Sequence, residues 1–152
     1  MRSETFIKKY LKKEVQGLLE TESYYPLLIY ATIGIETLGA IIDDKPIRAT
    51  NQSKGRFGSA LYHLFPNQYG FVNKGAFLYD SLRNHSAHNL IPSTKIFFVD
   101  KDSKSVRHLN QQTNQLTFVI ETFALDFIAA CDLALDKLKK GDVKSKNIAA
   151  WE

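Results

Sequence analysis

Residues 25–42, with the sequence YPLLIYATIGIETLGAII, are apolar almost throughout and carry one charged residue, Glu36. The length approaches what a helix needs to cross a bilayer, but the glutamate, two threonines and two glycines interrupt the run. We therefore predict a buried central helix from Ser23 to about Asp43, against which the other segments pack. Because a buried carboxylate needs a partner, we expect Glu36 to pair with an arginine of the core or to reach the site around Arg83.

Other segments repeat apolar residues at helical spacing and are expected to surround this helix. The first has Ile7, Leu11 and Val15 on one face and lysines on the other, and further helices are predicted over about 55–65, 75–88 and 113–140. Before the last helix, KIFFV (95–99) and SVRHL (105–109) flank the turn residues DKDSK, which predicts a small β-hairpin. The predicted fold class is all-α, an up-and-down bundle of about five helices with that hairpin inserted before the last helix.

The length and charge of the chain limit its class. A length of 152 residues suits one domain, which we assign to residues 1–141, followed by a polar tail over residues 142–152. The net charge of +4 permits binding to a polyanion without requiring it. The single cysteine, Cys131, excludes an intrachain disulfide and fits a reducing compartment. Because the N-terminal residues lack the apolar core of a secretory signal, we expect a cytoplasmic protein without a membrane segment.

The stretch LYDSLRNHSAHNLIPSTK, residues 78–95, gathers an arginine, an asparagine and two histidines near the predicted end of a helix. Arginine is a fixed cation whose planar fork matches phosphate oxygens, and histidine changes its protonation near neutral pH. Arg83 and His88 can therefore cleave a phosphodiester without a metal. The imidazole takes the proton of a ribose 2′-hydroxyl, and the guanidinium stabilises charge on the phosphorus oxygens. The structural alternative is that both side chains only interact with unpaired carbonyls at the helix C-terminus.

Helical geometry sets a condition on that chemistry. Arg83 and His88 are five positions apart, which is roughly 140° of rotation on an ideal α-helix. Asn84 and His88 are four positions apart and share a face, so Asn84 can orient the imidazole or contact a substrate. Because Pro92 forces the helix to end, we expect its last turn to loosen and to bring His88 back toward Arg83.

The residues LYDSLRNHSAH resemble the signature of the HEPN superfamily (higher eukaryotes and prokaryotes nucleotide-binding). That signature is an arginine, a polar residue directly after it and a histidine a few positions later, at the end of a helix. Arg83, Asn84 and His88 match it, with four residues between the arginine and the histidine. The apolar helix with IETLGAI, the helix RFGSALYHLF, the hairpin and the closing helix extend the resemblance more loosely over most of the chain.

This resemblance implies a small, mostly helical domain that often dimerises, with two copies of the motif lining a cleft at the dimer interface. Active members are metal-independent endoribonucleases without a cofactor, frequently toxins or phage-defence components. The catalytic residues are then Arg83, Asn84 and His88, while His85 is an added substrate contact or simply exposed. The expected partners are RNA and a second copy, and any antitoxin or nucleotidyltransferase is a separate chain. Other members have lost catalysis, so a non-catalytic binding or scaffold domain is the alternative function.

Two other groups of polar residues can be read as binding sites. Lys54 and Arg56 stand beside glycines in SKGRFGS, where they either help to hold an RNA backbone or belong to a solvated loop. Their order does not match a phosphate-binding P-loop. His85 and His88 have a spacing that suits two metal ligands, but no third ligand stands nearby, so we predict no metal site.

Overall fold

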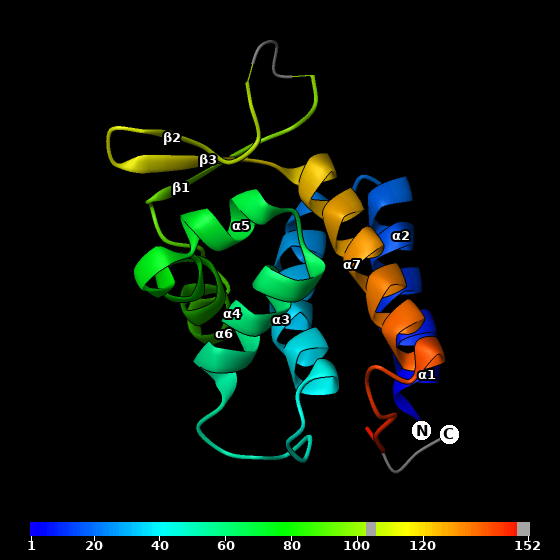
Figure 1. Ribbon diagram of the computed structural model, residues 1–152. Coiled ribbons are helices and arrows are strands. Elements are labelled where there is room, and N and C mark those ends of the chain that lie inside the picture. The colour runs from blue at the N-terminus through cyan, green and yellow to red at the C-terminus, as the bar shows by residue number, and fades with distance from the viewer. Residues whose placement is uncertain (103–105, 149–152) are drawn as a thin grey trace.

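The computed structural model describes residues 1–102 and 106–148, and it is mostly helical with one small sheet (Figure 1). The helical segments are α1 Ser3–Phe6, η1 Ile7–Lys12, α2 Lys13–Glu20, α3 Tyr24–Ile42, α4 Ser53–Leu64, α5 Asn67–Val72, η2 Lys74–Ala76, η3 Tyr79–Asn84, α6 His85–Asn89 and α7 Ile120–Lys140. Of these, η1 and η3 are π-helical and η2 is a 3₁₀ turn. The strands are β1 Ile96–Val99, β2 Asn110–Gln112 and β3 Gln115–Val119. The mostly helical class predicted from the sequence is confirmed.

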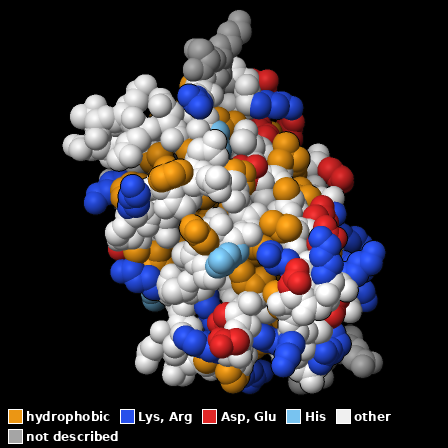
Figure 2. Space-filling model, in the orientation of Figure 1, with side chains coloured by type: hydrophobic (Ala, Val, Ile, Leu, Met, Phe, Trp, Pro, Cys, Tyr) orange, Lys and Arg blue, Asp and Glu red, His pale blue; other side chains and the backbone are white. Residues whose placement is uncertain are grey.

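The N-terminal helix is continuous through α1, η1 and α2, as its apolar spacing predicts. Ile7 and Leu11 are buried where this helix packs against α7. The lysines on its outer face lie among carboxylates, and Nζ of Lys12 is 2.6 Å from Oδ1 of Asp132 on α7. Figure 2 shows basic and acidic side chains interleaved over this side of the molecule. The lysines therefore belong to a solvated face of mixed charge.

Helix α3 is the predicted central helix, and it lies between α4 and α7 (Figure 1). Two glycines allow these neighbours to approach closely. A Cβ at Gly39 would lie 2.0 Å from the backbone oxygen of Arg56 on α4, and a Cβ at Gly34 would lie 2.6 Å from the ring of Phe127 on α7. By length and composition α3 could also cross a membrane, but 56% of that apolar window is buried inside the protein.

The sheet differs from the predicted hairpin. KIFFV does supply a strand, β1. The second predicted strand, SVRHL, is not found: residues 106–109 are not in a strand, and residues 103–105 lie outside the described residues. The hairpin is instead formed by the antiparallel strands β2 and β3, and β1 pairs with β3 in parallel, giving the order β1-β3-β2.

The predicted start of the last helix at residue 113 is therefore wrong, because residues 115–119 belong to β3 and α7 begins at Ile120. Leu116 and Phe118 are buried on one face of β3, with Gln115 exposed, which is the alternation of a half-buried strand. Between the helices predicted over 55–65 and 75–88, the structure has a further short helix, α5, which buries Tyr69.

The two ends of the described chain lie side by side (Figure 1). Arg2 and Asn147 form an isolated antiparallel bridge, and the N–H of Ser3 donates to the carbonyl oxygen of Lys146 at 3.0 Å. The described part of the predicted polar tail is thus paired with the start of the first helix through Lys146 and Asn147.

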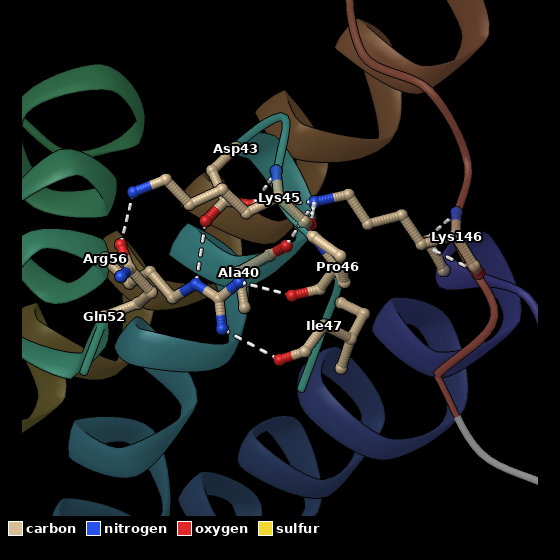
Figure 3. Close-up of polar contacts among 9 residues, drawn as sticks. Ala40, Asp43, Lys45, Pro46, Ile47, Gln52, Arg56 and Lys146 are labelled. Carbon is tan, nitrogen blue, oxygen red and sulfur yellow. Dashed lines mark hydrogen bonds and ion pairs between the residues drawn. The ribbon is translucent and has the colours of Figure 1, made fainter. Parts of the chain in front are cut away.

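Asp43, directly after α3, joins this segment to α4 (Figure 3). Nζ of Lys146 donates to Oδ1 of Asp43 at 2.7 Å, and Nε of Arg56 donates to Oδ2 of Asp43 at 2.7 Å. Both cations are shielded from water, with 15% and 7% of their side chains exposed. Burial acts to raise the pKa of Asp43, but the hydrogen bonds from Arg56 and Lys146 outweigh it and hold the pKa below its usual value.

Candidate active site on the η3–α6 helix

The motif helix is fixed to the core at its start. Oδ1 of Asn73 accepts hydrogen bonds from the backbone N–H groups of Leu78 at 3.0 Å and Tyr79 at 3.2 Å, so it caps the first turn. Leu78 and Leu82 are buried and orient the helix on the bundle. The next turn, η3, is π-helical, and such turns recur at functional sites.

The helix does not loosen before its end, so the predicted approach of His88 to Arg83 is wrong within one chain. Helical hydrogen bonding continues through Asn89, and the N–H of Leu90 still donates to the carbonyl oxygen of Ser86 at 3.0 Å. The chain turns only at Leu90, which has a left-handed φ of 58°. Pro92 follows this turn and therefore imposes no strain on the helix itself.

The side chains of the motif consequently divide between an inner and an outer position. Asn84, His85 and His88 line an open hollow of about 340 Å³ on the outer face, and both histidines are exposed. Asp80 and Asn89 complete the lining of this hollow. The structure therefore brings three of the sequence-predicted residues together, with a carboxylate beside them.

Arg83 takes the inner position. Its Nε lies 2.7 Å from Oε2 of Glu36 on α3, an ion pair without hydrogen-bond geometry. The guanidinium carbon is 5.5 Å from the ring centroid of Tyr79, and Nη1 makes a long contact of 3.4 Å with Oδ1 of Asn84. Of the two partners expected for Glu36, the one found is the arginine of the motif. Arg83 thus connects α3 to Asn84, which lines the hollow.

Apolar side chains are exposed next to the end of this helix. Leu90 and Ile91 are 60% and 65% exposed, and Tyr25 is 52% exposed. The hydroxyl of Tyr25 donates to the carbonyl oxygen of Leu90, so α3 supports the turn that carries these residues. Tyr79, which precedes the motif, packs inside the protein against Phe57.

Lys54 and Arg56 lie on α4 and have different surroundings. Lys54 is exposed, whereas Arg56 is 7% exposed and uses its whole guanidinium inside the protein. Besides its bond to Asp43, it donates to the carbonyl oxygens of Pro46 and Ile47, both at 2.8 Å (Figure 3). Neither residue lines the hollow at His88, so the structure does not bring them together with the motif.

A second polar cluster was not found by sequence reasoning. Tyr69, His108 and Asp126 are joined by hydrogen bonds, although they come from α5, the segment before β2, and α7. No local pattern marks them, because residues this far apart in the chain meet only through the tertiary fold. Burial lowers the pKa of His108 to about 4.

Within residues 1–102 and 106–148, no group of three or more His, Cys, Asp and Glu side chains is arranged to hold a metal ion. Comparisons of the chain with protein-family models, with curated proteins and with solved structures gave no match.

Proposed function

We propose that the chain is a metal-independent endoribonuclease of the HEPN type, with the helical bundle and motif arrangement of that superfamily. The observation that carries the proposal is the grouping of Asn84, His85 and His88 around one open hollow, with Arg83 in contact with Asn84. Two exposed imidazoles give the site candidate general bases and acids. The arginine adds a fixed positive charge in contact with Asn84.

The reaction we propose is an internal displacement on the RNA backbone. His88 takes the proton of a ribose 2′-hydroxyl, whose oxygen then forms a bond to the adjacent phosphorus. The bond between phosphorus and the 5′-oxygen breaks, and that oxygen leaves as a hydroxyl after it receives a proton. The products are a 2′,3′-cyclic phosphate and a 5′-hydroxyl end, and no water is consumed in this step.

Arg83 is the group proposed to stabilise charge on the phosphate oxygens. Its Nε is held against Glu36, which leaves the two terminal amino groups of the guanidinium as the donors for a phosphate. Glu36 is then a positioning residue, since it acts on the substrate only through Arg83. Asn84 connects the guanidinium to the face that carries His88.

We propose further that the active form is a homodimer. One copy supplies a single His88, whereas the displacement needs both a base and an acid. A two-fold axis beside the helix end would place a second motif opposite the first, because a symmetric interface uses the same patch twice. The exposed side chains of Leu90, Ile91 and Tyr25 supply apolar area for such a contact next to the motif. RNA cleavage of this kind fits a toxin or phage-defence component, with any antitoxin on another chain.

A second candidate is a non-catalytic binding or scaffold domain of the same fold. The ion pair between Arg83 and Glu36 favours it, because the arginine already has a structural partner inside the protein. This candidate predicts binding of nucleotide or protein without cleavage, and harmless expression in a host cell.

The test is an RNA cleavage assay with purified protein and excess chelator. We expect cleavage with 2′,3′-cyclic phosphate ends, its loss in His88→Ala and a strong reduction in Arg83→Ala. RNA with 2′-deoxy substitutions at the cleaved positions should resist. His63→Ala is the matched control, because His63 is exposed on α4 and does not line the hollow.

Circular dichroism must show that the His88→Ala protein is folded. Cleavage by this variant at the rate of the unaltered protein would remove the mechanism. A strictly monomeric protein with full activity in sedimentation experiments would remove the composite dimer site but not the chemistry.

A further inference from the structure

The cluster of Tyr69, His108 and Asp126 lines a cleft of about 470 Å³ between α5, the segment before β2, and α7. None of the residues Arg83, Asn84, His85 and His88 lines this cleft. Its volume falls in the range of small-molecule sites in proteins. Gln68, Arg107 and Asn110 add polar groups to the same walls. The cleft is therefore a separate site whose chemistry can be read from its hydrogen bonds.

The hydrogen bonds in the cleft have one consistent direction. The backbone N–H of Val119 donates to Nδ1 of His108 at 2.9 Å, so Nδ1 carries no proton and the neutral ring has its proton on Nε2. That Nε2–H donates to the hydroxyl oxygen of Tyr69 at 2.8 Å, and the tyrosine hydroxyl donates to Oδ2 of Asp126 at 2.8 Å. The lowered pKa of His108 agrees with a neutral ring. The chain of donors ends on the carboxylate and fixes its orientation.

Asp126 is half-buried and lacks a cationic partner. Within the described ranges, the only hydrogen bond to it comes from Tyr69, and no ion pair includes it. Burial raises its pKa above the usual value, and the bond from Tyr69 only partly opposes that effect. A partly buried carboxylate is costly unless donors satisfy it. The bond from Tyr69 uses one acceptor site of Oδ2, so Oδ1 and the second acceptor site of Oδ2 are open to a ligand in the cleft.

The nucleobases differ in how they can meet such a carboxylate. An ionised carboxylate only accepts hydrogen bonds, and it binds best to two donors that lie side by side. Guanine offers N1–H and the N2 amino group next to each other on one edge. Adenine and cytosine place an acceptor beside their donor there, and uracil has one donor between two acceptors. Of the four bases, guanine therefore fits an ionised carboxylate at Asp126 best.

We propose that this cleft binds a guanine nucleotide, with Asp126 accepting from N1–H and N2, and with Arg107 contacting the phosphate. Arg107 is exposed and lines the cleft, and a guanidinium matches phosphate oxygens in shape and charge. The amides of Gln68 and Asn110 are donors for the guanine O6 and N7 atoms. The proposal does not depend on RNA cleavage at His88.

The test is titration calorimetry of the whole chain with GMP, AMP, CMP and UMP near neutral pH. We expect GMP to bind about tenfold or more tightly than the other three, the discrimination typical of a paired set of hydrogen bonds to one base. Asp126→Asn should lose this preference, because an amide places a donor against the donors of guanine. Arg107→Ala should weaken GMP binding more than guanosine binding.

Asp136→Asn is the control, because Asp136 is exposed on the same helix α7 and does not line the cleft. If Asp126→Asn unfolds, the exposed Arg107→Ala variant still decides the phosphate contact, and the four-nucleotide comparison decides the base. Equal affinity for the four nucleotides, or no GMP binding at millimolar concentration, would overturn the proposal. Loss of cleavage in His88→Ala with GMP binding retained would show that the two sites are independent.

Discussion

Nε of Arg83 lies 2.7 Å from Oε2 of Glu36, and the two side chains are only 18% and 21% exposed. The contact joins the motif helix to the one charged position of the central helix. The same arginine is therefore a structural element as well as the proposed phosphate contact. Its two roles can be separated by measuring stability and activity on the same variants.

Removing either partner of this pair should leave an uncompensated, mostly buried charge. We expect Glu36→Ala and Arg83→Ala each to cost about 3 kcal/mol of unfolding free energy. The double variant should cost less than their sum by about 1 kcal/mol or more, measured by urea denaturation. The exposed pair of Lys12 and Asp132 is the control, and truncating it should cost at most about 1 kcal/mol. Additive effects of the two alanine variants would contradict coupling between Glu36 and Arg83.

The close approach of α3 and α4 depends on Gly39. A methyl group there would lie 2.0 Å from the backbone oxygen of Arg56, which cannot rotate away. We expect Gly39→Ala to destabilise the protein by about 3 kcal/mol or more in chemical denaturation. Gly17→Ala is a matched change in α2, where nothing lies within 4 Å of the added carbon, and it should stabilise by about 0.5–1 kcal/mol. A tolerated Gly39→Ala would show that the helices can separate.

Asp43 should make the stability of the protein depend on pH in the acid range. Its pKa is lowered in the folded protein by Arg56 and Lys146, against the opposing effect of burial. Its stabilisation is therefore fully present above the unfolded pKa of about 3.9 and is lost as pH falls through the lower folded value. Asp43→Asn should lower the urea midpoint at neutral pH and flatten its decline below about pH 4. The adjacent Asp44 is exposed, and Asp44→Asn should leave both unchanged.

His108 should make the stability of the protein depend on pH in a higher range than Asp43 does. Burial lowers its pKa to about 4 in the folded protein, whereas an unfolded histidine titrates near about 6.5. Below that pH the unfolded chain takes up a proton that the folded one does not, so stability is complete above about 6.5 and falls toward about 4. Denaturation midpoints should show this slope and lose it in His108→Gln. The exposed His63 gives the control variant His63→Gln, which should keep the slope.

Cys131 should be a sensor of unfolding. The side chain is fully buried on α7, and burial raises the pKa of its thiol to about 12. Because the thiolate is the reactive form, alkylation in the native state should be about a hundredfold or more slower than in urea. Mass spectrometry after iodoacetamide treatment measures this rate. Rapid native labelling would mean that α7 opens locally.

Much of the helical fold can be predicted from the sequence, because apolar residues of the N-terminal helix and α4 repeat at helical spacing and α3 is apolar almost throughout. The prediction fails over residues 113–119, where the spacing from Leu116 to Ile120 also fits a helical period. There β3 gains backbone hydrogen bonds from β1 and β2, and this long-range pairing overrides the local pattern. The residues of β3 alone do not show which strands will pair with it.

The two candidate sites also differ in whether the sequence predicts them. Arg83, Asn84 and His88 can be found because they stand close together in the sequence and match a short signature. The inward direction of Arg83 follows from Glu36, a partner on another helix. Tyr69, His108 and Asp126 give no sequence signal, since their cluster exists only when three separate segments pack together.

The pairing of Arg2 and Ser3 with the segment around Lys146 has a consequence for biosynthesis. The ribosome makes Lys146, which completes the hydrogen bonds of the first helix, 143 positions after Ser3. Contacts of such large sequence separation close late in folding. The nascent chain can therefore form its helices during translation, yet it cannot join its two ends or complete the contacts of Asp43 until synthesis has passed Lys146.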